Sequence, residues 1–175
     1  MSSNIPMVDL VAQYHSIKPE IDEAIGRVLT NGTFILGEEV KTFESHVASH
    51  TGVAEAVGVA SGTDALLVAL MALDVGSGDE VIIPTFSFFA TAGVVARLGA
   101  TPVFVDIDPV DYCIDPSLIA DRVSDRTKAV IPVHLFGLCA DIDAIAGAAP
   151  GVPIVEDAAC AVGAVYKGRP AGGLG

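Results

Sequence analysis

Asp157 is the residue whose type and position most strongly suggest chemistry. It lies in residues 152–160, a short apolar run that ends in the adjacent acids Glu156 and Asp157 and then in small residues. Such a run is typical of a buried parallel strand, and open α/β sheets bind ligands outside the carboxyl ends of their strands. Asp157 is therefore a candidate partner for the positively charged atom of a ligand. The alternative is an acid that caps a helix or faces solvent.

A candidate anion site lies at residues 61–64, which read Ser-Gly-Thr-Asp. These residues separate a predicted strand at 56–60 from a predicted helix at 65–73. A small turn before a helix presents backbone N–H groups at the positive end of the helix dipole, which suits a phosphate. Gly62 and Thr63 are the candidate ligands, and Thr63 can add its hydroxyl. The alternative is that Ser61, Thr63 or Asp64 only caps the helix.

A third candidate is the aromatic loop at residues 85–91. It contains Phe86, Phe88 and Phe89 directly after a predicted strand at 80–84, although only 6% of the chain is aromatic. A phenylalanine cluster usually belongs to a core. At the ligand-binding edge of a sheet, one of these rings can instead stack on a planar cofactor.

The charge balance argues against nucleic acid or a membrane as a partner. The chain has 22 acidic and 9 basic residues and a formal net charge of −13, whereas both partners need clustered cations. No apolar run is long enough to span a membrane and residues 1–6 do not resemble a signal peptide, so we expect a cytoplasmic protein. Cys113, Cys139 and Cys160 lack the spacing of a zinc site, so we expect free thiols and no metal.

The rest of the pattern predicts how these candidates are positioned. Helices are expected at 16–29, with a C-cap at Asn31 and Gly32, and at 38–49, with Val40, Phe43, Val47 and Ala48 facing the core. Further strands are expected at 103–106 and 128–133, helices at 117–123 and 141–149, and a hairpin at 162–169. Strands that alternate with helices predict an α/β fold, a mostly parallel sheet with helices on both faces.

The three candidates meet at the carboxyl ends of strands. Together they suit a flat ligand that has a phosphate and a protonatable ring nitrogen. The chain also resembles the N-terminal part of the DegT/DnrJ/EryC1/StrS family of sugar aminotransferases, which have pyridoxal-phosphate fold type I. The matching stretches are residues 9–14, 34–37, 60–66, 78–84, 104–109, 131–137, 156–159 and 166–169.

This resemblance implies a role for each candidate residue. Gly62 and Thr63 bind the phosphate of pyridoxal 5′-phosphate, Phe88 stacks on its ring, and Asp157 pairs with the pyridinium nitrogen. Cys160 occupies a cofactor-contacting position where the family usually has Gln or His. The implied reaction moves an amino group from glutamate or glutamine to a nucleotide-linked keto sugar. The implied assembly is a homodimer, to whose sites the loop at 33–37 can contribute.

The same resemblance implies an incomplete domain. The Schiff-base lysine of the family lies beyond the position of Gly175, and the lysines present are Lys18, Lys41, Lys128 and Lys167. We therefore expect residues 1–50 to form a helical segment and residues 51–175 an incomplete, inactive cofactor-binding domain. The strand at 56–60 is expected to rest on helices alone or to pair elsewhere, because in the family the strand before the lysine and a final antiparallel strand lie between it and the strand that ends at Asp157.

Two other functions are compatible with the sequence. Some family members replace the lysine with histidine and act as sugar dehydratases. A non-catalytic binding module could also retain the fold.

Overall fold

The computed structural model describes residues 6–175. The centre of its main sheet is β1, Glu80–Pro84. All five residues of β1 are buried, and β1 pairs in parallel with β2, Thr101–Val105, and with β3, Thr127–Val130. The predicted strand at 80–84 and the predicted parallel sheet are both confirmed. The described residues divide into two compact units, one that ends at Glu44 and one that runs from Ser45 to Gly175.

The stretch that ends at Asp157 lies beside β3. Parallel bridges join Val130 to Ile154 and Val133 to Asp157. The Val155 N–H donates to the Val130 carbonyl at 2.9 Å, and the His134 N–H donates to the Asp157 carbonyl at 3.0 Å. This stretch therefore extends the sheet on the far side of β3 from β1, which confirms that it runs parallel to its neighbour.

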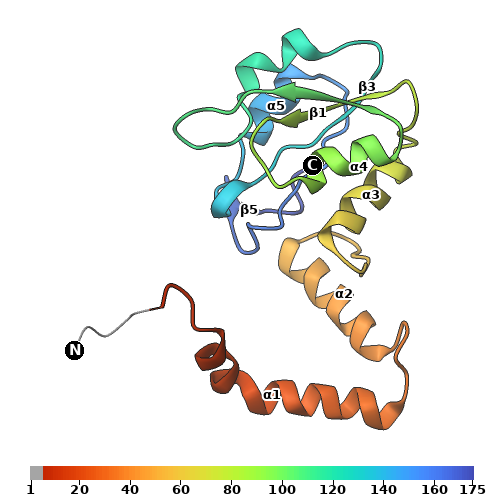
Figure 1. Ribbon diagram of the computed structural model, residues 1–175, viewed down its shortest axis with the longest axis vertical. Helices are drawn as coiled ribbons and strands as arrows, with labels where there is room; N and C mark the ends of the chain where they lie inside the picture. The colour runs from red at the N-terminus through yellow and green to blue at the C-terminus, as the bar shows by residue number, and fades with distance from the viewer. Residues whose placement is uncertain (1–5) are drawn as a thin grey trace, which may run out of the picture. The chain divides into compact units, whose positions relative to one another are not determined.

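Helices pack against both faces of this sheet. Val81 and Ile83 of β1 pack with α3, Gly62–Ala72, and α4, Ala90–Arg97. Ile82 points to the other face and packs with α5, Ile142–Ala148. Figure 1 shows α3 and α4 together on one side of the sheet and α5 on the other. Because successive side chains of a strand point to opposite faces, a strand covered on both faces is apolar throughout.

Two predicted elements of the larger unit are wrong. Residues 56–60 form no strand, and Val57 is 77% exposed. No strand among residues 6–175 pairs with this stretch, so it does not form the strand that was expected to rest on helices alone or to pair elsewhere. In place of a helix at 117–123 there are two 3₁₀ turns, η1, Pro116–Leu118, and η2, Ala120–Arg122.

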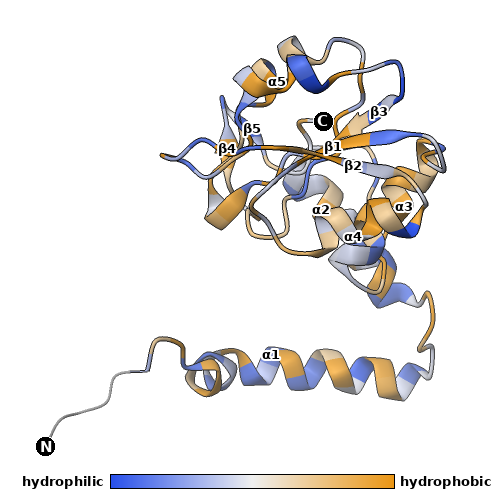
Figure 2. Cartoon of the chain, turned by 45° about the horizontal axis from the view of Figure 1, so that its top comes forward, coloured by the Kyte–Doolittle hydropathy of each residue, from blue (hydrophilic) through white to orange (hydrophobic). Residues whose placement is uncertain are grey.

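The N-terminal residues are helical, as predicted, but their helices are longer than predicted. α1 is Leu10–Asn31, because Asp9 caps it by accepting a hydrogen bond from the Ala12 N–H at 2.9 Å. Gly32 has the left-handed conformation expected of a C-cap. Apolar and polar residues alternate along α1 in Figure 2. α2 is Glu38–Thr51, and Phe43 was wrongly assigned to the core, because it is 59% exposed.

The predicted C-terminal hairpin is present as β4, Val165–Tyr166, and β5, Arg169–Pro170. Lys167 and Gly168, between the two strands, have positive φ angles, as tight hairpin turns require. The Tyr166 hydroxyl donates to Asp141, the N-cap of α5, at 2.5 Å. This contact ties the hairpin to the start of α5. No helix among residues 6–175 has both the length and the apolar character needed to cross a membrane.

Candidate functional site

One pocket contains all five residues that the sequence singled out. Its volume is about 330 Å³, and it lies where β3 and the neighbouring stretch end and where α3 and α4 begin. Its lining is mostly apolar, with one carboxylate and one thiol. The lining residues are Gly62, Thr63, Leu66, Ser87, Phe88, Ala90, Val133, Leu135, Asp157, Ala159 and Cys160.

The N-terminus of α3 forms one end of this pocket. Ser61 is the N-cap, and its Oγ accepts a hydrogen bond from the Asp64 N–H at 3.1 Å. The capping alternative is therefore correct for Ser61. It leaves Gly62 and Thr63 as the first helical residues, whose N–H groups have no intrahelical acceptor. Their position at the positive end of the helix dipole suits an anionic group.

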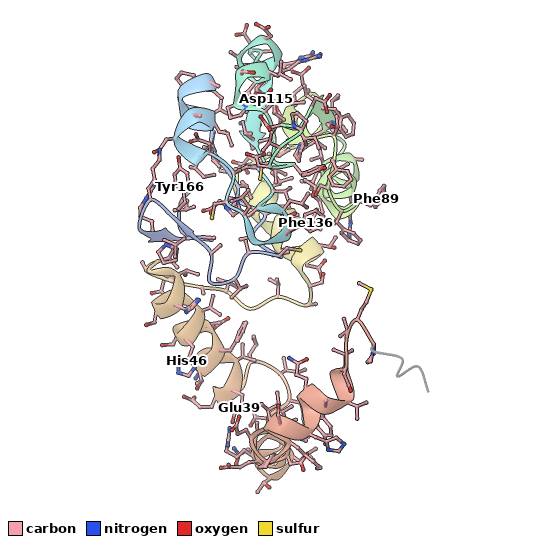
Figure 3. All side chains as sticks on the ribbon, turned by 90° about the vertical axis from the view of Figure 1, so that its left-hand side faces the viewer. Glu39, His46, Phe89, Asp115, Phe136 and Tyr166 are labelled. Atoms are coloured by element: carbon pink, nitrogen blue, oxygen red, sulfur yellow. The ribbon has the colours of Figure 1, made fainter. Side chains whose placement is uncertain are left out.

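The three phenylalanines of the loop after β1 have three different surroundings. Phe86 packs against Tyr112, with 6.1 Å between the ring centroids. Phe89 lies over Gly93 and projects from the surface in Figure 3. Phe88 lines the pocket, and it is 76% exposed although it is a large apolar ring. Phe88 is therefore the ring of this loop that a ligand in the Asp157 pocket can contact.

Asp157 supplies the charge in the pocket. Its Oδ2 accepts a hydrogen bond from the Thr91 hydroxyl at 3.2 Å, and its Oδ1 accepts one from the Ala159 N–H at 3.3 Å. Both donors are neutral, and Asp157 forms no ion pair within residues 6–175. A half-buried carboxylate without a protein counter-ion favours a ligand that carries positive charge.

Glu156 faces away from the pocket and has a different role. Its two oxygens accept hydrogen bonds from the backbone N–H groups of Gly172, Leu174 and Gly175, at 2.9, 2.5 and 2.7 Å, and its Oε2 lies 2.9 Å from Nε2 of His134. Burial by itself raises the pKa of the Glu156 carboxyl, but these donors outweigh burial and lower the pKa to about 2.

His134 completes this arrangement and is a structural residue. It is fully buried, and its Nδ1 accepts a hydrogen bond from the Ala140 N–H at 3.1 Å. Nε2 therefore carries the proton and donates to Glu156. The sequence analysis did not identify this role of Glu156. The signal available in the sequence was the alternation of side chains along a strand: if Asp157 points toward the ligand-binding side, the adjacent Glu156 points the other way.

Cys160 is the thiol that lines the pocket, and no lysine lines it. Cys160 is exposed and lines the pocket, while Cys113 is buried and Cys139 is half-buried. None of the four lysines lines the pocket, and three of them, Lys18, Lys41 and Lys167, pair with carboxylates elsewhere. Residues 6–175 contain no cluster of His, Cys, Asp and Glu suited to a metal ion.

Comparison with known proteins identifies the family of this chain. The model of the DegT/DnrJ/EryC1/StrS aminotransferase family matches residues 15–175. The chain belongs to this family. The resemblance inferred from the sequence motifs is thereby confirmed.

Two relatives of this chain are named as aminotransferases of nucleotide sugars. The chain is 51% identical to the UDP-2-acetamido-2-deoxy-3-oxo-D-glucuronate aminotransferase of Pseudomonas aeruginosa, over 94% of this chain and 46% of that protein. It is 49% identical to the UDP-N-acetyl-3-dehydro-alpha-D-glucosamine 3-aminotransferase of Acidithiobacillus ferrooxidans, over 98% of this chain and 47% of that protein.

A solved relative confirms the fold. The crystal structure of DesV from S. venezuelae, in complex with a ketimine intermediate, superposes with a TM-score of 0.93 at 45% identity. The match covers 96% of this chain and 46% of DesV. The chain thus spans about half the length of the relatives it matches.

Proposed function

We propose that the Asp157 pocket binds pyridoxal 5′-phosphate. The observation that carries this proposal is an Asp157 carboxylate without a counter-ion in the same pocket as a free helix N-terminus and an exposed phenylalanine ring. The three features match the three chemical parts of the cofactor. The N-terminus of α3 suits the phosphate, the ring of Phe88 suits the face of the pyridine, and Asp157 suits the protonated ring nitrogen.

Each residue then has a defined role. The N–H groups of Gly62 and Thr63 hold the phosphate, with the Thr63 hydroxyl as a further donor. Phe88 excludes water from one face of the ring, and Cys160 contacts the cofactor from the segment after Asp157. Asp157 holds the proton on the ring nitrogen. When bound, the protonated ring supplies an electron sink for the carbanion that transamination generates.

We also propose that this chain is the cofactor-binding part of an aminotransferase. The proposed substrate is a nucleotide-linked keto sugar, which the names of the relatives support. The proposed amino donor is glutamate or glutamine. No lysine lines the pocket, so this chain is expected to hold the cofactor without a covalent bond and to be inactive by itself. Residues 51–175 would form the cofactor-binding domain, and residues 1–50 the helical segment that precedes it.

A homodimer in the cytoplasm is the proposed state of the protein. α1 has no buried residue, and the apolar side chains of Phe34, Ile35 and Leu36 in the following loop are all exposed. Apolar surface of this kind is typical of an interface between subunits. Light scattering should therefore give the mass of a dimer for the wild-type protein, and Phe34→Glu should reduce that mass. A monomeric wild-type protein would contradict this part of the proposal.

Pyridoxamine 5′-phosphate provides the direct test of the pocket, because it carries the same ring and phosphate but needs no lysine. Calorimetry should show saturable binding of one molecule per chain. Asp157→Asn should weaken this binding at least tenfold, because the ring nitrogen loses its charged partner. Asp121→Asn is the matched control, since Asp121 is exposed and lies outside the pocket.

Cys160 provides an independent readout in the wild-type protein. Burial raises the pKa of the Cys113 and Cys139 thiols, which disfavours the reactive thiolate at both positions. Pyridoxamine 5′-phosphate should slow the alkylation of Cys160 and leave that of Cys139 unchanged, as measured by peptide mass spectrometry. Failure to bind, or equal binding by wild type and Asp157→Asn, would overturn the proposal.

A further inference from the structure

Thr91 is buried against the one carboxylate of the pocket without lining the pocket itself. It lies in the first turn of α4 and is 1% exposed. Its hydroxyl donates to Oδ2 of Asp157 at 3.2 Å, a contact between residues 66 positions apart in the chain. Oγ1 of Thr91 also lies 3.1 Å from Oγ of Ser87, which does line the pocket.

The direction of this hydrogen-bond chain follows from the number of protons. A threonine hydroxyl has one proton, and an ionised carboxylate can only accept. Since Thr91 gives its proton to Asp157, the bond between the two hydroxyls must be donated by Ser87. The chain therefore runs from Ser87 through Thr91 to Asp157, and each donor strengthens the next.

Two other helical threonines, Thr30 and Thr51, behave differently. The hydroxyls of Thr30 and Thr51 donate to the carbonyls four residues earlier, Gly26 and Val47, both at 2.8 Å. That local bond is the usual way for a helical threonine to satisfy its hydroxyl. Thr91 uses its proton on Asp157 instead. If Thr91 only filled space at this buried site, an apolar side chain of the same shape would serve equally well, so the hydroxyl indicates a role in holding Asp157.

We infer that Thr91 is a positioning residue, which fixes the Asp157 carboxylate for the positively charged ring nitrogen of the bound cofactor, and that Ser87 orients the Thr91 hydroxyl for this task. The inference rests on the proposed function. Thr91 holds one carboxylate oxygen and the Ala159 N–H holds the other, so both rotation and displacement of the carboxylate are restricted. A β-branched side chain in a helix has few rotamers, which makes Thr91 a rigid support.

Two variants separate the hydroxyl from the shape of the side chain. Thr91→Val keeps the shape and removes the hydroxyl, whereas Thr91→Ser keeps the hydroxyl. The ligands are pyridoxamine 5′-phosphate and its analogue with carbon in place of the ring nitrogen. For the nitrogen-containing ligand, Thr91→Val should raise the dissociation constant about tenfold, the usual scale for a lost hydrogen bond to a charged group. Thr91→Ser should restore most of the affinity.

The carbon analogue makes the test specific. It cannot pair with Asp157, so Thr91→Val and wild type should bind it equally well. In the protein without ligand, the carboxyl ¹³C resonance of Asp157 should shift in Thr91→Val and return in Thr91→Ser. Ser87→Ala should have a smaller effect in the same direction, because it removes only the outer bond of the chain.

The outcomes distinguish this inference from the proposed function. If wild type binds neither ligand, the cofactor proposal fails. If wild type binds the nitrogen-containing ligand and Thr91→Val binds it equally well, the positioning role is wrong while the cofactor proposal stands. If Thr91→Val weakens both ligands equally, Thr91 supports the pocket as a whole and does not act through Asp157, which also overturns the inference.

Discussion

Glu156→Gln should destabilise the protein far more than an ordinary loss of one surface charge. Oε1 of Glu156 accepts two backbone N–H groups, and Oε2 accepts a third together with Nε2–H of His134. The amide nitrogen of glutamine is a donor, so at either oxygen position it would face two donors, one of which, from His134 or Leu174, is buried. Each buried donor left without an acceptor costs about 1–3 kcal/mol.

The pKa of Glu156 gives an independent magnitude. Lowering of the pKa from its ordinary 4.5 to about 2 means that the folded protein stabilises the ionised carboxylate. At about 1.36 kcal/mol for each pH unit, this corresponds to roughly 3 kcal/mol of unfolding free energy at neutral pH. For a protein of this size we expect a fall in melting temperature of roughly 6–12 °C.

Urea denaturation at pH 7 measures this difference, with Glu55→Gln as the matched control, because Glu55 is an exposed glutamate of the same unit. The pKa is lower in the folded than in the unfolded state, so the stabilisation is complete above about pH 4.5 and is lost as the pH falls through about 2. The difference in unfolding free energy between wild type and Glu156→Gln should therefore decrease as the pH falls over this range. If the unfolding free energy of Glu156→Gln lies within about 0.5 kcal/mol of that of Glu55→Gln, the usual range for surface substitutions, the reasoning is refuted.

Three further changes test separate parts of the structure. Phe88→Ala should weaken the binding of pyridoxamine 5′-phosphate by several-fold to tenfold, the scale of an aromatic stacking contact, without lowering the melting temperature, because the ring is exposed. Ser61→Ala should lower the unfolding free energy in urea by about 1 kcal/mol, because α3 loses its N-cap. Tyr166→Phe should raise the pKa of Asp141 in an NMR titration, because the Tyr166 hydroxyl is the main group that lowers it. Unchanged affinity, unchanged stability and an unchanged titration, respectively, would contradict these expectations.

Much of the fold could be predicted because local patterns already specify it. The β-branched apolar run at 81–83 indicates the centre of β1, since a strand covered on both faces carries apolar residues in succession. Gly32 ends α1 because a left-handed residue is needed there. By contrast, the apolar stretch at 56–60 resembles a strand but forms none, because a strand requires neighbours that no local pattern can supply.

The gathering of the site residues was also predictable. Phe88 follows β1 and Asp157 pairs beside the end of β3, and the carboxyl ends of parallel strands meet at one edge of the sheet. Gly62 joins them at the start of α3, although the stretch before it forms no strand. The sequence could not select Phe88 from the three phenylalanines of its loop. That choice depends on Phe86 packing against Tyr112 and on Phe89 lying over Gly93.

The sequence by itself determined the family, the parallel sheet and five of the residues that line the pocket, because strand periodicity, turn chemistry and motif spacing are local properties. Only the tertiary structure decided how the two adjacent acids divide their roles. Asp157 accepts a hydrogen bond from Thr91, 66 positions earlier in the chain, and has no counter-ion among residues 6–175, while Glu156 contacts His134 and the backbone of residues 172–175. These partners come together only when the sheet forms, and the neighbours in space, rather than the residue type, set the chemistry of a carboxylate.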